Sequence, residues 1–288
     1  MTFTVRVPAS TSNLGAGFDC VGLAVDIWLE ASLTPGSGPP EYGGALADIS
    51  PDADVIHTHL AAAGIAGDYR LRVHSNIPVG RGLGSSAAGW VAALALAQMA
   101  GANPVDPDEL FRRAAQLEGH PDNAGPAVYG GLVLAAHEPT RLALHADVAV
   151  ALAVPNRPVE TAAARALLPD QVARQVVAEQ AARAAALVTG LASGDGALIH
   201  HGMEDQLAVQ HRKDLIAGFD DAVQAGHDAG AHGVTISGSG STLLAFASPA
   251  DAASVAEAMA EALQRNDNPA TPLTPAVSDR GVSVGKTP

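Results

Sequence analysis

The sequence of 288 residues contains a single cysteine, Cys20, and aromatic side chains make up only 3% of it. One thiol can form neither an intrachain disulfide nor a zinc site built from cysteines, which favours a reducing, cytoplasmic setting. Cys20 itself is expected to be a small buried apolar residue rather than a nucleophile. Basic residues are also scarce, since 16 Lys and Arg against 30 Asp and Glu give a formal charge of −14. This charge argues against binding nucleic acid or an anionic membrane, although locally placed donors and a metal ion could still hold a nucleotide.

The sequence also lacks an uninterrupted run of 18 apolar residues, and Met1 to Val7 reads as a strand without the basic start of an export signal. Neither membrane insertion nor export is therefore expected. The length suits one large or two ordinary domains, and 48% hydrophobic residues are enough to build a core.

What the chain does have is a glycine-rich run, Pro78 to Ala88, between a predicted strand and an apolar, alanine-rich helix. The first turn of a helix has free N–H groups and a partial positive charge, and glycine lets a ligand approach the backbone, so the run suits a phosphate group. Gly84 is followed by Ser85 and not by lysine, which excludes a Walker A loop, and the spacing GxGxG does not fit a dinucleotide fingerprint. A plain glycine turn before a core helix stays open as the alternative.

Three motifs, in this order along the chain, resemble those of the GHMP kinases, a family that includes galactokinase and the kinases of homoserine, mevalonate and phosphomevalonate. They are Pro8 to Asp19, Pro78 to Ala88 and Ile236 to Thr242. The run Glu118 to Asn123 narrows the resemblance to the homoserine kinases. The resemblance covers nearly the whole chain and thins after Gln264. It implies an enzyme that uses ATP and Mg²⁺ to phosphorylate the hydroxyl of L-homoserine, giving O-phospho-L-homoserine on the route to threonine.

Strands and helices alternate without the regular spacing of a parallel sheet, which predicts an α+β fold of packed layers. Strands are expected over 3–9, 20–33, 69–75, 130–136, 148–154, 232–237 and 241–247, and helices over 54–63, 85–100, 106–118, 159–168, 170–191, 212–229 and 250–264. Residues 35–54 and 266–275 read as connections, and 276–284 as a final hairpin strand. The resemblance implies an N-terminal domain like ribosomal protein S5 domain 2 (1–154) and a ferredoxin-like C-terminal domain (155–288), of which 266–288 is partly linker-like.

Phosphoryl transfer needs donors around the phosphates, a metal ion that neutralises them and a well-aimed acceptor hydroxyl. The nucleotide run is expected to supply backbone donors, with the Arg81 side chain either covering the phosphates or facing solvent. Its residues are Pro78, Val79, Gly80, Arg81, Gly82, Leu83, Gly84, Ser85, Ser86, Ala87 and Ala88. By resemblance, Ser85 and Glu118 hold the Mg²⁺; taken singly, they would read as a helix cap and a solvated acid.

An amino-acid substrate needs acceptors for its ammonium group and a cationic site for its carboxylate. Asn13 and Asp19 are candidates for the ammonium. Arg165, one helical turn after Thr161, and Arg212 match family positions and are candidates for the carboxylate, because a guanidinium fits its two oxygens. An isolated arginine more commonly forms a surface salt bridge.

Asn123 is the candidate that holds the reacting hydroxyl, with His120 beside it. Asparagine cannot take up a proton, so catalysis is expected from positioning and charge neutralisation, with the proton passing to the phosphate or to water. His120 is expected to form structural hydrogen bonds rather than act as the base. By resemblance, the run Ser237 to Ser241 packs beside the nucleotide loop and shapes the substrate pocket; taken alone, it would read as a plain glycine turn.

Two positions depart from the family pattern. Ala16 replaces a common proline, which should loosen the first loop, and Gln206 replaces a frequent arginine, which should remove part of a network near Arg212. Two other functions stay open: a GHMP kinase for another small molecule such as mevalonate, and a nucleotide or amino-acid sensor without catalysis. The expected partners are ATP and a small substrate, with no nucleic acid and no membrane, and whether the chain forms a homodimer is left open.

Overall fold

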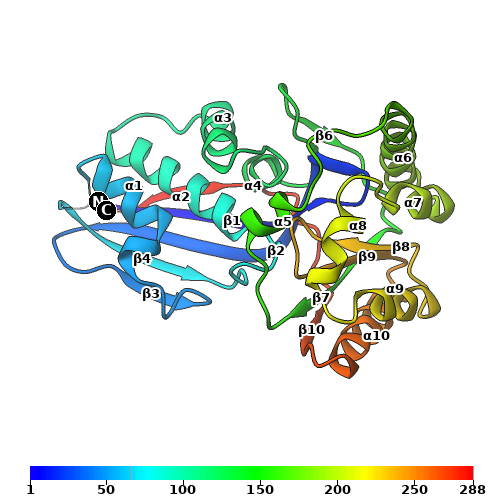
Figure 1. The fold of residues 1–288 in the computed structure, drawn as a ribbon. Helices are drawn as coiled ribbons and strands as arrows, with labels where there is room; N and C mark the ends of the chain where they lie inside the picture. The colour runs from blue at the N-terminus through cyan, green and yellow to red at the C-terminus, as the bar shows by residue number, and fades with distance from the viewer. Residues whose placement is uncertain (66, 288) are drawn as a thin grey trace.

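The computed structural model describes residues 1–65 and 67–287, and their strands form two separate sheets (Figure 1). The first sheet contains, in order, β11 (Ser283–Thr287), β1 (Thr2–Asn13), β2 (Gly17–Pro35), β4 (Tyr69–Ser75) and β3 (Glu41–Gly44), and β5 (Leu132–Leu134) and β6 (Thr140–Leu142) extend it from β2. The second sheet is antiparallel, in the order β10 (Ala270–Leu273), β7 (Ala149–Pro155), β9 (Leu243–Ala247) and β8 (Gly233–Ile236).

Helices cover both sheets and agree with the predicted α+β class. The first part of the chain contributes η1 (Pro51–Ala53), α1 (Val55–Ala62), α2 (Ser85–Ala100), α3 (Pro107–Glu118) and α4 (Ala124–Tyr129). The second contributes α5 (Thr161–Ala166), α6 (Arg174–Ser193), α7 (Gly196–Met203), α8 (Val209–Arg212), η2 (Lys213–Leu215), α9 (Phe219–Asp228) and α10 (Ala252–Arg265). No helix within 1–65 or 67–287 combines the length and apolar character needed to cross a membrane.

The alanine-rich helix α2 is the centre of the first layer. Its small side chains are buried along most of its length, so the helix packs closely on β1 and β2 while α1, α3 and α4 contact its other sides. Gly89 fits this packing, because a Cβ there would lie 2.6 Å from Cγ2 of Val55 in α1. The close packing fixes the start of α2 near the end of β1, where the two sheets approach each other (Figure 1).

Several predicted elements are wrong in extent or pairing. The helix predicted over 212–229 is broken before Phe219, because Ile216 is extended and Gly218 has a left-handed backbone (φ +81°), and α9 begins only after them. The strand predicted over 276–284 is wrong, since Val277 forms an isolated bridge with Val25 and residues 283–287 pair with β1. The two expected connections, 35–54 and 266–275, contain the short strands β3 and β10.

The chain passes between the two sheets more than once. β7, which ends at Pro155, pairs within the second sheet, and β11 returns to the first sheet, where Thr2 lies opposite Thr287. The first and the last strand of the described residues are therefore neighbours in the first sheet (Figure 1). The boundary expected after residue 154 does not coincide with this division into sheets.

Candidate active site

The glycine-rich run forms a loop whose shape requires glycine. Gly80, Gly82 and Gly84 all have a left-handed backbone, with φ values of +68°, +73° and +68°. A Cβ on Gly82 would lie 2.0 Å from the carbonyl oxygen of Ser237, and a Cβ on Gly84 would lie 2.2 Å from Oγ of Ser10. The loop is thus pressed against β1 on one side and against the loop between β8 and β9 on the other.

Hydrogen bonds from distant segments hold this loop in place. The Ser10 N–H donates to the Leu83 carbonyl at 3.2 Å, and the Val159 N–H donates to the Gly80 carbonyl at 3.0 Å. The Ser237 hydroxyl donates to the Gly82 carbonyl at 2.6 Å. These bonds occupy carbonyl groups of the loop, while Gly84, at the N-cap of α2, has no side chain to cap the helix. The first N–H groups of α2 are consequently available to a ligand.

The Arg81 side chain is bonded to backbone carbonyls. Its Nε donates to the Pro155 carbonyl at 3.0 Å, and its other nitrogens donate to the carbonyls of Val79 and Asn156. The guanidinium therefore connects the loop to the chain that leaves β7, while Arg81 also lines the same cleft as the rest of the loop.

One cleft contains the loop and every predicted substrate residue. From the nucleotide run it includes Pro78 to Ser86, whereas Ala87 and Ala88 are buried in the core of α2 behind it. Its apolar end is lined by Leu29, Leu46, Ile49, Val55 and Ile56. Its polar end is lined by Asn13, Asp19, Glu118, His120, Asp122, Asn123, Thr161, Arg165 and Arg212. The cleft thus has an apolar part and a charged part joined at the start of α2.

The hydroxyl that contacts Glu118 belongs to Ser86 and not to Ser85. Ser86 Oγ donates to Glu118 Oε1, while Ser85 lines the same cleft one residue earlier. Burial raises the pKa of the Glu118 carboxyl, and the hydrogen bond from Ser86 and the neighbouring His120 oppose this shift. The hydroxyls and the carboxylate at the helix start are hard oxygen donors, so the residues present fit Mg²⁺.

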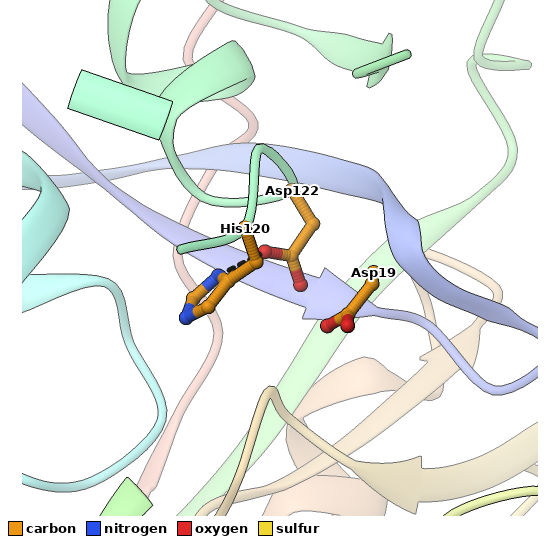
Figure 2. A group of neighbouring side chains, drawn as sticks. All are labelled: Asp19, His120 and Asp122. Atoms are coloured by element: carbon orange, nitrogen blue, oxygen red, sulfur yellow. Dashed lines mark hydrogen bonds and ion pairs between the residues drawn. The ribbon is translucent and has the colours of Figure 1, made fainter. Parts of the chain in front are cut away.

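Asp122, which sequence reasoning did not single out, completes a compact group with Asp19 and His120 (Figure 2). Each of the three offers one ligand atom, and these atoms lie within 4.8 Å of one another. Asp122 is 2% exposed and accepts hydrogen bonds from His120 Nδ1 at 2.7 Å and from the Asn123 N–H at 3.0 Å. Burial lowers the pKa of His120, but the hydrogen bond and charge of Asp122 outweigh it, so the pKa of His120 is raised. The signal in the sequence that could have identified Asp122 was its position next to Asn123.

The amide of Asn123 is held by two hydroxyls from β1. Ser10 Oγ donates to Asn123 Oδ1 at 2.9 Å, and Asn123 Nδ2 donates to Ser12 Oγ at 3.0 Å. Asn123 is 8% exposed and lines the cleft. Each of these bonds leaves part of the amide free, so Asn123 can offer a ligand its second N–H and the second lone pair of Oδ1.

Asp19 and Arg165 form an ion pair across the cleft. Arg165 Nη1 and Nη2 donate to the two Asp19 oxygens at 3.0 and 2.7 Å, and about a third of each side chain is exposed. Asn13, in contrast, is used internally: its Nδ2 donates to the Gly238 carbonyl and its Oδ1 accepts from the Asp19 N–H, both at 2.9 Å. Asn13 therefore shapes the loop that presents Asp19. Asn13 also lines the cleft, and its contact with an ammonium group stays a prediction.

The second arginine is deeply buried. Arg212 is 3% exposed and donates to the carbonyls of Ala164 and Gly238, both at 3.2 Å, and its guanidinium lies 5.5 Å from the centre of the Phe18 ring. Burial lowers its pKa. The structure brings Arg212 to the same cleft as Arg165, as expected, and Thr161 Oγ1 lies there 3.1 Å from Ser239 Oγ.

The two departures from the family pattern meet at Gln180. The Ala16 N–H, which a proline would lack, donates to the Gly202 carbonyl at 3.0 Å, so this position fastens the first loop to α7 instead of loosening it. Gln180 Nε2 donates to the Ala16 carbonyl at 3.2 Å and to Asp205 Oδ1 at 2.8 Å, and its Oε1 accepts from the Gln206 N–H at 2.9 Å.

Two family models match the chain. The model of the GHMP kinases N terminal domain matches residues 53–131, and that of the GHMP kinases C terminal matches residues 187–265. Among curated proteins, a homoserine kinase of Synechocystis sp. is 36% identical over 279 residues, covering 91% of both chains. A homoserine kinase of Moorella thermoacetica is 37% identical over 255 residues, covering 84% of this chain and 86% of the relative.

Solved structures give the same result for the fold. A homoserine kinase from Cytophaga hutchinsonii superimposes with a TM-score of 0.84 at 29% identity, covering 98% of this chain and 97% of that structure. A mevalonate kinase from L. major shares the fold with a TM-score of 0.66 at 16% identity. The fold is therefore common to enzymes with different substrates.

Proposed function

Because the chain belongs to the homoserine kinase family of the GHMP kinases, we propose that its cleft transfers the γ-phosphate of ATP to the hydroxyl of L-homoserine. The products are ADP and O-phospho-L-homoserine, on the route to threonine. Membership in this family confirms the recognition made from the three motifs, the two-domain α+β fold and the use of ATP.

The observation that carries the choice of substrate is that two carboxylates and two guanidinium groups lie at the polar end of the cleft. Asp19 and Asp122 place carboxylates within 4.8 Å of each other, and Arg165 and Arg212 place guanidinium groups in the same cleft. An amino acid brings an ammonium group for the acids and a carboxylate for the arginines. Mevalonate has a carboxylate for the arginines but no ammonium group, so it would form no ion pair of its own with these acids.

The nucleotide fits the other end of the cleft. The free N–H groups at the start of α2 and the left-handed glycines suit the triphosphate, and the apolar walls formed by Leu46, Ile49 and Val55 suit an aromatic base. The phosphates would then lie between the base and the polar end, next to Asn123.

We assign the metal ligands to the hydroxyls of Ser85 and Ser86 and to the Glu118 carboxylate. When bound, Mg²⁺ supplies positive charge that neutralises the phosphate oxygens. The hydrogen bond between Ser86 and Glu118 keeps these oxygens together at the mouth of α2.

Asn123 positions the acceptor hydroxyl through its second N–H, since Ser10 and Ser12 fix the orientation of the amide. The hydroxyl proton passes to a phosphate oxygen or to water. The raised pKa of His120 favours the protonated imidazole, a form that cannot accept a proton and that adds positive charge beside the transferred phosphate. Catalysis therefore depends on positioning and on neutralisation of charge.

A coupled assay of ADP release tests the proposal with L-homoserine and mevalonate as alternative acceptors. Activity is expected with homoserine only. Asp19→Asn should raise the KM for homoserine about tenfold or more, since a bond to a charged group is lost, and should leave the KM for ATP unchanged. Asp26→Asn, which changes an exposed carboxylate on β2, is the control. ATP binding without transfer to any hydroxyl amino acid would instead indicate a sensor.

A further inference from the structure

Arg81 lies in the nucleotide loop, but its guanidinium is committed to the chain that leaves the second sheet. Nε donates to the Pro155 carbonyl at 3.0 Å, Nη2 donates to the Asn156 carbonyl, and Nη1 donates to the Val79 carbonyl within the loop itself. All three acceptors are backbone oxygens without a full charge. Arg81 therefore fixes two chain segments relative to each other.

The segment that Arg81 holds leads directly into α5. The Val159 N–H donates to the Gly80 carbonyl at 3.0 Å, and Ser241 Oγ donates to the Arg157 carbonyl, so the connection is bonded to the nucleotide loop and to the loop between β8 and β9. α5 is only six residues long and has no side-chain cap. Arg212 holds its Ala164 carbonyl and Ser239 contacts its Thr161, so the connection that precedes α5 is one of three attachments that set its position.

Arg165 is in this helix, and its bonds to Asp19 require accurate placement. The two guanidinium nitrogens reach the two carboxylate oxygens at 3.0 and 2.7 Å. A small displacement of α5 would break this fork-like geometry, whereas the N–H groups at the start of α2 belong to a different, well-packed helix. The loop arginine and the substrate arginine are thus connected through residues 155–160.

We propose that Arg81 is a positioning residue for the amino-acid substrate. It fastens residues 155–160 to the nucleotide loop and thereby holds Arg165 in the place where the substrate carboxylate binds. The inference rests on the proposed function, in which Arg165 binds that carboxylate. It predicts that changes at Arg81 affect homoserine more than ATP, although Arg81 lies within the nucleotide loop.

Steady-state kinetics with ATP and homoserine varied separately test this role in Arg81→Gln and Arg81→Lys. Both variants should raise the KM for homoserine about tenfold or more, because displacement of a binding group by a fraction of an ångström is costly. The KM for ATP should change by less than about twofold. Lysine keeps the charge but cannot reach three carbonyls, so it should not rescue the defect. Arg113→Gln, on the exposed face of α3, is the matched control.

The opposite pattern would overturn the inference. If Arg81 covers the phosphates, Arg81→Gln raises the KM for ATP and Arg81→Lys restores it. Circular dichroism checks that the variants are folded, and if Arg81→Gln does not fold, the comparison of Arg81→Lys with wild type decides the question by itself.

A double mutant gives a second readout. If Arg81 acts through Arg165, Arg81→Gln should add nothing to the homoserine KM of Arg165→Gln, and additive effects would contradict the connection. Failure of the proposed function is separate and visible in the wild type, which would then not phosphorylate homoserine. A wild type that is active while the Arg81 variants affect only ATP refutes the positioning role alone.

Discussion

Gly80 and Gly82 offer a controlled test of the nucleotide loop, because alanine strains the backbone equally at both positions. Their φ values are +68° and +73°, and a left-handed alanine costs about 1–2 kcal/mol. Their surroundings differ. A Cβ on Gly80 would lie 3.2 Å from Cβ of Pro158, whereas a Cβ on Gly82 would lie 2.0 Å from the Ser237 carbonyl oxygen.

A carbon and a carbonyl oxygen approach to about 3.3 Å at closest, so Gly82→Ala must separate the two loops by about 1 Å. A displacement of this size in a catalytic site costs up to about 100-fold in rate. We therefore expect kcat/KM of Gly82→Ala to fall about 100-fold from the displacement, in addition to the loss from backbone strain, and that of Gly80→Ala to fall about 30-fold at most, from the backbone strain alone.

The coupled ADP-release assay measures kcat/KM for ATP and for homoserine in each variant, and thermal melting measures the stability of both. Similar decreases in Tm would show that alanine strains the backbone to the same extent in both variants. Equal losses of activity in the two variants, or a Gly82→Ala variant as active as wild type, would refute the reasoning that contact with the Ser237 loop fixes the nucleotide loop.

Three further predictions concern a metal ligand, a titrating group and a buried hydrogen-bond hub. Glu118→Gln should require about tenfold more Mg²⁺ for half-maximal activity. Because burial raises the pKa of Glu118, the wild type should also lose Mg²⁺ affinity on acidification at a higher pH than an ordinary glutamate would, and a Mg²⁺ titration at several pH values should show no such loss in Glu118→Gln. His120→Gln should lower kcat by less than about tenfold, whereas loss of a general base would cost about 10²–10⁴-fold. The pKa of His120 is higher in the folded protein than its unfolded value of 6.5. Protonated His120 therefore stabilises the fold fully below pH 6.5, and this stabilisation is lost as the pH rises through the folded pKa. The Tm of wild type should consequently exceed that of His120→Gln by more at acidic than at alkaline pH. Gln180→Leu, which removes the bonds to Ala16, Asp205 and Gln206, should lower the free energy of unfolding in urea by about 3 kcal/mol, and a loss below about 1 kcal/mol would contradict its role as a hub.

Local sequence signals predicted the strand–loop–helix unit of the nucleotide loop well. The alternation over 69–75, the glycines on alternate positions and the alanine-rich helix from Ser85 are all short-range patterns, and they correspond to β4, the loop and α2. The pairing of residues 283–287 with β1 could not be predicted in this way, because it joins the first and last strands of the described residues and depends on an edge that only the folded sheet presents.

The cleft was predicted as a set of residues, but not as a set of contacts. Asp19, Arg165 and Arg212 were correctly expected to share one site, whereas the ion pair between Asp19 and Arg165 and the internal bonds of Asn13 follow from tertiary geometry. The same holds for Arg81, whose partners at 155 and 156 are far away in the sequence. Motifs in the sequence indicate which residues line the same site. Their hydrogen-bond partners depend on distances in the folded protein, which the sequence does not give.

The pairing of β1 with β11 has a consequence for the newly made chain. β1 leaves the ribosome before the other strands and helices of the described residues, and its outer edge is completed only by β11, the last of them. While the residues between these two strands are being synthesised, this edge is open to strands of other nascent chains, which makes the partly synthesised protein prone to aggregation. Deleting residues 283–287 would leave the edge permanently open, so yield in the soluble fraction should suffer before catalysis does.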